Sequence, residues 1–153
     1  MSTLELKVPP PVVALLMAAA LWPLSSLALV LDVPSFIRIT LAVLIALLGG
    51  AFSLAGVTSF RRAKTTVNPM KPEKASSLVT SGVYAITRNP MYVGLLLVLV
   101  AWAVFLSSVV ALAGPVAFFL YIGRFQIAPE ERILSKMFGP EFIEYQARVR
   151  RWL

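Results

Sequence analysis

Long apolar stretches separated by short polar segments dominate the chain. Nearly every residue from Val12 to Leu31 is apolar, and a second apolar stretch runs from Phe36 to Phe60. Each is close to or above the roughly 20 residues that an α-helix needs to cross a bilayer. We therefore predict two membrane-spanning helices, over 12–31 and 36–60. Gly49 and Gly56 give the second helix small surfaces that allow close helix contact, which favours a central position in the bundle.

A third apolar stretch, from Met91 to Gly123, contains no charged residue. At about 1.5 Å per residue it is too long for one crossing of a hydrocarbon core of roughly 30 Å. We therefore predict a helical hairpin over 91–127, bent either near Ser107–Ser108 or at Gly114–Pro115. The pattern as a whole predicts an all-α integral membrane bundle with about four transmembrane segments, folded as a single domain over 1–153.

Positive charge gathers in two segments that flank the hairpin. Six of the 14 basic residues lie between Arg61 and Arg88, and six more lie between Arg124 and Arg151. Basic segments next to membrane spans tend to remain in the cytoplasm, which makes 61–90 a cytosolic loop. Both clusters then lie on one side, and both termini are expected in the cytoplasm of an inner or plasma membrane protein. In this setting the net charge of +7 favours anionic lipid headgroups over nucleic acid.

The last part of the chain, 128–153, has the pattern of amphipathic interfacial helices. Pro129 fits a first helical position, and Glu130 and Glu131 suit the positive end of a helix dipole. Arg151 beside Trp152 is typical of an anchor at the membrane interface. We therefore expect this tail to lie along the cytosolic surface.

The residue types that are missing exclude several kinds of chemistry. The chain contains no histidine and no cysteine. A Cys/His zinc site, a Ser-His-Asp triad and a thiol nucleophile are therefore impossible, and we expect no metal site. None of the proposed spans carries a charge near its middle, which counts against an ion-coupled transporter.

Two polar sites remain as candidates for chemistry, one before the hairpin and one after it. In the first, Tyr84 and Arg88 are four residues apart and would share a face if the segment is helical. The second contains Glu130 and Glu131. Taken separately, each also fits a plain structural reading, as a snorkelling arginine or as glutamates at a helix start. If the hairpin folds back on itself, the two sites meet at one membrane face.

The order of these motifs adds weight to the chemical reading. The chain reads Leu78-Val-Thr-Ser-Gly-Val-Tyr, Thr87-Arg-Asn-Pro-Met-Tyr-Val-Gly, an apolar hairpin, Pro129-Glu-Glu, and Phe138-Gly-Pro-Glu-Phe-Ile-Glu-Tyr. From Thr65 to Trp152 it resembles the membrane methyltransferases that include isoprenylcysteine carboxyl methyltransferases and phospholipid N-methyltransferases. The first two spans match that family only in being hydrophobic. The resemblance implies S-adenosylmethionine-dependent methyl transfer to a lipid or other hydrophobic acceptor at the cytosolic face.

The resemblance also implies which residues form the site. The cofactor would be bound by Gly82, Tyr84, Arg88, Asn89, Pro90, Tyr92 and Gly94, with Glu130 and Glu131 closing the pocket. Arg88 and Glu131 would orient the acceptor or handle its proton. A carboxylate acceptor would favour a cation such as Arg88, whereas an amine would favour a glutamate as base. The sequence leaves this choice open, together with the oligomeric state.

One residue departs from the family pattern, which often has Arg-His-Pro where this chain has Arg88-Asn89-Pro90. An asparagine side chain donates and accepts hydrogen bonds but does not act as a base near neutral pH. A mechanism that needs an imidazole at this position is therefore in question. The alternative from another class is a non-catalytic membrane module that binds anionic lipid or a partner protein through its basic loop and tail.

Overall fold

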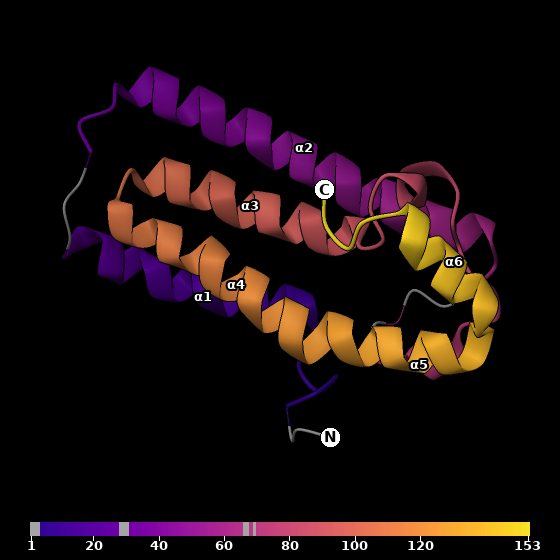
Figure 1. Cartoon of the computed structure of the whole chain (residues 1–153). Helices are drawn as coiled ribbons and strands as arrows, with labels where there is room; N and C mark the ends of the chain where they lie inside the picture. Colours follow the sequence, from indigo (N-terminus) through magenta and orange to yellow (C-terminus); the bar gives the residue numbers. More distant parts are fainter. Residues whose placement is uncertain (1–3, 28–30, 66–67, 69) are drawn as a thin grey trace.

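Helical segments run alternately up and down the molecule, and a short helix follows the last of them at one end (Figure 1). The computed structural model describes residues 4–27, 31–65, 68 and 70–153, and the fold of these residues is all-α. The helices are α1 (Pro10–Ser26), α2 (Ser35–Arg62), α3 (Pro90–Leu106), α4 (Ala113–Ile122), α5 (Ala128–Phe138) and α6 (Pro140–Arg148). Short helical turns connect them: η1 (Pro72–Lys74), η2 (Gly82–Ala85), η3 (Val109–Leu112) and the π-helical η4 (Gly123–Ile127).

Among the residues that the structure describes, two helical segments are long and apolar enough to cross a membrane. They are α2, with 28 residues, and the continuous segment Val109–Phe138, with 30 residues. Helices α1 and α3 are apolar but shorter, with 17 residues each. The predicted first span, 12–31, overlaps α1, although its residues 28–30 lie outside the described part of the chain. The all-α class is thus confirmed, while the number of four transmembrane segments stays a prediction.

The hairpin bends at the first of the two places that the sequence allowed. Ser107 takes the left-handed backbone conformation, with φ of 51°, and ends α3. Its hydroxyl donates to the Leu31 carbonyl at 2.9 Å, and the Leu31 N–H donates to the Ser107 carbonyl at 2.7 Å. The alternative bend lies in the first turn of α4, where Gly114 packs against Leu21.

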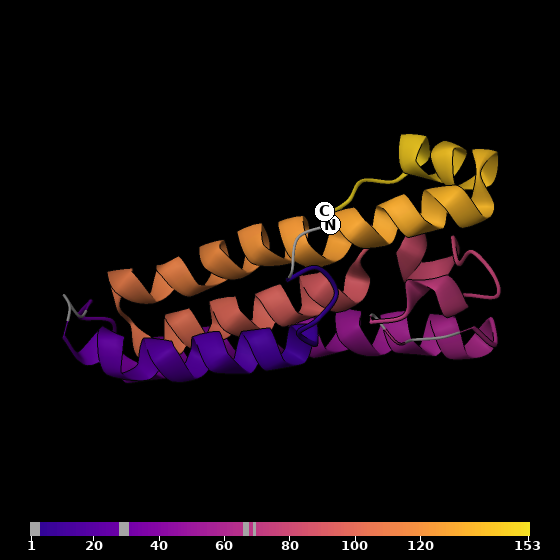
Figure 2. The same cartoon turned by 90° about the horizontal axis from the view of Figure 1, so that it is seen from below.

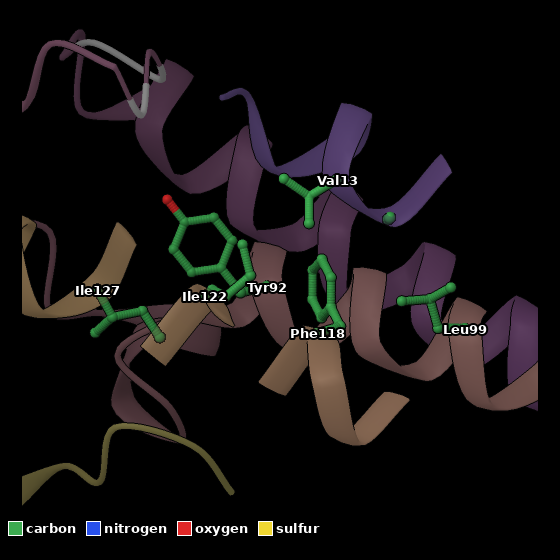
Figure 3. Close-up of a cluster of buried hydrophobic side chains, with 7 residues drawn as sticks. Val13, Tyr92, Leu99, Phe118, Ile122 and Ile127 are labelled. Carbon is green, nitrogen blue, oxygen red and sulfur yellow. The ribbon is translucent and has the colours of Figure 1, made fainter. Parts of the chain in front are cut away.

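The core lies where α1, α3 and the α4–η4 segment meet. Figure 3 shows the Tyr92 ring among side chains from all three, with its hydroxyl oxygen at the edge of the cluster. Phe118, Ile122 and Ile127 have no exposed surface, and Leu99 is almost as deeply buried. This packing fixes the start of α3 against the end of the α4–η4 segment, which is where the candidate site lies.

Helix α2 lies at the edge of the bundle, against α3, and the predicted central position is wrong. Gly49 and Gly56 serve this one contact, because a Cβ atom added at Gly49 would lie only 2.7 Å from the Gly94 carbonyl oxygen and one added at Gly56 would lie 2.7 Å from the Met91 side chain. Leu44, Leu47 and Leu54 on its other faces are exposed. The central helix is α3, which packs against α1, α2 and α4.

The sequence predicts that Pro129 starts a separate helix, but in the structure it lies within a continuous one. Figure 2 shows α4, η4 and α5 as one continuous rod, and the backbone stays helical through Ile127 and Ala128. The Ala128 N–H donates to the Gly123 carbonyl, five residues back, so the rod widens into a π turn before the proline. The division between the predicted segments 91–127 and 128–153 falls at the end of this turn. We refer to α4–η4–α5 below as the rod.

Candidate active site

A cavity lies at the end of the molecule where α2, η1, η2, α5 and α6 gather (Figure 1). Both basic segments of the sequence reach this end, because α2 ends at Arg62, the rod ends with α5, and α6 follows the rod. The cavity is lined by Phe60, Asn68, Pro72, Ala75, Ser77, Leu78, Val79, Tyr84, Arg88, Asn89, Met91, Tyr92, Ile127, Glu130, Glu131, Leu134, Phe142 and Tyr145. The lining is mostly apolar, with a small set of polar groups that converge from segments far apart in sequence.

Glu130 receives two hydrogen bonds on the same oxygen. The Tyr92 hydroxyl donates to Glu130 Oε1 at 2.7 Å, and Gln126 Nε2 donates to that atom at 2.7 Å. Tyr92 stands in the first turn of α3, and Gln126 stands in the π turn one helical turn before Glu130. Both donors are buried, at 5% and 2% exposed. The carboxylate is therefore held in one orientation between α3 and the rod.

Glu131 lies between two arginines. Arg88 Nη2 donates to Glu131 Oε1 at 2.8 Å, and Arg151 Nε donates to the same oxygen at 3.1 Å. Arg88 Nη1 also donates to the Gln146 carbonyl at 3.1 Å. The remaining nitrogen of this guanidinium, Nε, is buried and has no hydrogen-bond partner among the described residues. A buried donor without a partner is costly, which makes this atom a candidate for ligand binding.

The C-terminal segment 149–151 holds the segment before α3 in place. The Arg88 N–H donates to the Arg150 carbonyl at 3.0 Å, and Asn89 Nδ2 donates to the Arg151 carbonyl at 2.8 Å. Asn89 precedes Pro90, which occupies the first helical position of α3. The residue that stands in place of the family's common histidine therefore donates from its side-chain amide to the backbone of the C-terminal segment.

Aromatic side chains form another wall of the cavity. The Phe60 and Tyr84 rings meet edge to face with centroids 5.1 Å apart. The Tyr145 hydroxyl donates to the Tyr84 carbonyl at 2.7 Å. Burial, with a smaller contribution from the neighbouring Tyr145, raises the pKa of Tyr84 well above its usual value, and burial likewise raises the pKa of Tyr145. Both phenols are therefore neutral at physiological pH, and Tyr145 remains a donor.

The two polar sites predicted from the sequence do meet. Six of the predicted residues line the cavity: Tyr84, Arg88, Asn89, Tyr92, Glu130 and Glu131. Three others lie outside its lining. Gly82 begins η2 with φ of +64°, Pro90 is buried at the start of α3, and Gly94 faces α2, where a Cβ atom would lie 2.5 Å from the Gly49 carbonyl oxygen. Their assignment to the cofactor stays a prediction, and the structure shows each of them shaping the backbone.

Several residues of the site were not found by sequence reasoning. Gln126 carried a usable signal, because it is the only side-chain amide in the apolar hairpin 91–127. Phe60 resembles many other aromatic residues of the chain, and no local pattern distinguishes it. Tyr145 ends the motif Phe138-Gly-Pro-Glu-Phe-Ile-Glu-Tyr, but nothing in that motif indicates what its hydroxyl contacts. Arg151 was interpreted as an interfacial anchor, whereas its side chain bonds Glu131.

Comparison with known proteins identifies the family of the chain. The family model of phospholipid methyltransferases matches residues 37–141, and the chain belongs to this family. Together with its two apolar helices of membrane-spanning length, this makes it a membrane protein of a methyltransferase family. No solved structure matches.

Individual relatives point the same way. Protein-S-isoprenylcysteine O-methyltransferase B of Arabidopsis thaliana is 33% identical over 109 residues, which cover 67% of this chain and 52% of that protein. A probable protein-S-isoprenylcysteine O-methyltransferase of Oryza sativa subsp. indica is 35% identical over 109 residues, covering 67% of this chain and 54% of that protein. An uncharacterized protein of Haemophilus influenzae is 48% identical over 63 residues, covering 41% of this chain and all of that protein. The chain spans about half the length of the plant relatives.

Proposed function

We propose that this protein transfers a methyl group from S-adenosylmethionine to a lipid or other hydrophobic acceptor at the cytosolic face of a membrane. The observation that carries the proposal is the joining of the two family motifs around one cavity. Arg88 pairs with Glu131, and Tyr92 donates to Glu130, although 43 and 38 residues separate the partners. Neither pair is needed to hold an apolar bundle together, since buried polar pairs seldom add net stability.

The residues of the cavity fit the chemical groups of this cofactor. Its carboxylate needs a cationic donor, and Arg88 Nε is a buried guanidinium atom without a partner among the described residues. Its ammonium needs an acceptor, which the Glu130 carboxylate provides. Its sulfonium is suited to aromatic faces, which Tyr84 and Phe60 present in the lining. The bound cofactor would supply an already activated methyl group.

The protein's own contribution is then alignment and exclusion of water. Glu131 and the Gln146 carbonyl fix the Arg88 guanidinium from two sides, so that its remaining donor points in one direction. Leu134 and Phe142 keep water from the wall formed by α5 and α6. Holding two reactants in line in a dry site provides much of the rate enhancement of such a displacement. Arg88 and Glu131 are then the candidates to orient the acceptor: Arg88 if the acceptor is a carboxylate, and Glu131 as the base if it is an amine.

An apolar groove suits the hydrophobic part of the acceptor. It runs between α1, α2 and α3 and is lined by Pro11, Ala14, Leu15, Ala18, Ala42, Val43, Ala46, Leu95, Val98, Leu99, Ala101, Trp102 and Phe105. Leu95 stands one helical turn after Met91 and close to Tyr92, both of which line the cavity. An acceptor with its tail in this groove would have its polar end near Glu130.

Calorimetry with purified protein in detergent tests cofactor binding. The wild-type chain should bind S-adenosylmethionine, and Arg88→Ala and Glu130→Ala should abolish the heat of binding, because each removes one partner of the cofactor. Glu141→Ala is the matched control, since Glu141 is an exposed carboxylate at the start of α6. A folded wild-type protein that binds anionic vesicles but gives no heat with the cofactor would support the non-catalytic membrane module instead.

A transfer assay tests the acceptor. Methyl-labelled cofactor is incubated with the protein and a total membrane lipid extract, and the labelled product is identified. Ala46→Phe should fill the groove and raise the KM for that acceptor with the cofactor affinity unchanged. Ala51→Phe, on an exposed face of the same helix, should leave both values unchanged. If both substitutions change the KM for the acceptor equally, the groove does not bind the acceptor.

A further inference from the structure

The segment before α1 folds back onto the rod where η4 meets α5. The Leu6 N–H donates to the Phe125 carbonyl at 3.1 Å, and Arg132 Nη2 donates to Glu5 Oε2 at 2.7 Å. The Glu5 side chain is only 4% exposed, although it carries a carboxylate. Val8 then packs against the core cluster that contains Tyr92. The segment therefore touches the rod both before and after Pro129.

The contact with Phe125 meets a specific need of the rod. In an α-helix the carbonyl of Phe125 would accept the N–H of the residue four positions later, but that residue is Pro129, which has no N–H. Leu6 supplies the donor instead. To do so it takes the left-handed backbone conformation, with φ of 55°. For a residue with a branched side chain this conformation costs roughly 1–2 kcal/mol and persists only where surrounding contacts require it.

The same part of the rod sets the direction of the two glutamates. A π turn inserts one residue relative to an α-helix, which rotates every later side chain by about 100° around the helix axis. Gln126 and Ile127, within the turn, and Glu130 and Glu131, just after it, all line or bond into the cavity. A regular α-helix over 123–127 would direct the glutamates away from Tyr92 and Arg88.

We propose that Glu5 and Leu6 form a clamp that holds the π turn and thereby positions Glu130 and Glu131 for binding the methyl donor. Glu5 and Arg132 are positioning residues, because neither lines the cavity. The predicted effect on binding of the methyl donor rests on the proposed function. The claim that Glu5 and Leu6 hold the π turn of the rod does not.

A double-mutant cycle tests the positioning role. Glu5→Met and Arg132→Met each remove the ion pair with little change in side-chain length. Each should weaken S-adenosylmethionine binding about fivefold to tenfold, and the double variant should weaken it no further, because both remove one contact. Lys7→Met, at an exposed neighbouring position, is the control and should leave the affinity unchanged. Additive effects, or a Glu5→Met affinity equal to that of Lys7→Met, would overturn the positioning role.

Hydrogen exchange without any cofactor separates this inference from the proposed function. In Glu5→Met the backbone amides of 123–138 should exchange at least about tenfold faster than in the wild type, with the amides of α3 unchanged. In Lys7→Met they should not change. Unchanged exchange over 123–138 in Glu5→Met would overturn the clamp. A wild-type chain that binds no donor would overturn the proposed function instead, and the exchange rates would still decide the clamp.

Discussion

The two ion pairs of Glu131 should differ in strength because they differ in burial. The side chains of Arg88 and Glu131 are 12% and 15% exposed, whereas that of Arg151 is 42% exposed. Breaking a buried pair by removing one partner costs about 3–5 kcal/mol, and an exposed pair contributes at most about 1 kcal/mol. Arg88 also bonds the Gln146 carbonyl. With its residual exposure considered, we expect Arg88→Met to lower the free energy of unfolding by about 2–3 kcal/mol, and Arg151→Met by less than about 1 kcal/mol.

Equilibrium unfolding in detergent, followed by circular dichroism, measures both values. Arg148→Met is the control, because Arg148 is an exposed arginine at the end of α6. The double variant Arg88→Met/Arg151→Met should cost less than the sum of the single variants, since both arginines share Glu131. Equal costs for the two single variants, or a cost of Arg88→Met no larger than that of Arg148→Met, would refute the argument from burial.

Three further predictions concern packing, a buried hydrogen bond and pH. Gly94→Ala should lower the free energy of unfolding by about 1–3 kcal/mol, because its Cβ atom would lie 2.5 Å from the Gly49 carbonyl oxygen. Gly50→Ala, with nothing within 4 Å of its Cβ position, should be neutral or slightly stabilising. Thermal unfolding measures both variants, and equal effects on stability would contradict the α2–α3 contact. Tyr145→Phe should cost about 1–2 kcal/mol, because it leaves the Tyr84 carbonyl without its donor. Since the folded-state pKa of Tyr145 is raised above the usual value of 10.0, wild-type stability should fall as pH rises above about 10, and Tyr145→Phe should make that decline shallower. If stability falls equally steeply with pH in wild type and Tyr145→Phe, measured from unfolding curves over a pH series, the predicted role of Tyr145 in this decline is wrong.

The sequence predicted the helices well and their arrangement less well. Apolar stretches near membrane-spanning length are a strong signal, so the second span and the two arms of the hairpin were found. The bend remained a choice of two, because Ser107–Ser108 and Gly114–Pro115 carry similar turn signals. The contact joins Ser107, at the end of α3, to Leu31, in the connection between α1 and α2, and neither segment alone indicates it. Small residues on α2 predicted close helix contact, but they did not show that α2 would make this contact with α3 alone and lie at the edge of the bundle.

The family motifs predicted which residues would form the site, but not what each of them would contact. Glycines and a proline in such motifs also define turns and close helix contacts. For this reason Gly82, Pro90 and Gly94 could not be separated in advance from residues that line the cavity. Gln126 joins the site by bonding Glu130, four residues later and just after the π turn. Arg151 joins it by bonding Glu131, 20 residues earlier, because the chain returns to the site after α6.

The sequence by itself determined that this chain forms apolar helices, which residues carry its polar chemistry, and that its two charged segments lie at one end. The helices follow from the composition and length of each apolar stretch, which are local properties. The residues of the site follow from the family motifs, and the common end of the charged segments follows from the even number of spans predicted between them. Only the tertiary structure decided that Tyr92 would meet Glu130 and that Arg88 would meet Glu131. The physical reason is that a π turn before Pro129 changes the angular position of every side chain after it. That turn is held by a backbone donor from Leu6, more than a hundred residues away, which no periodicity within the helix encodes.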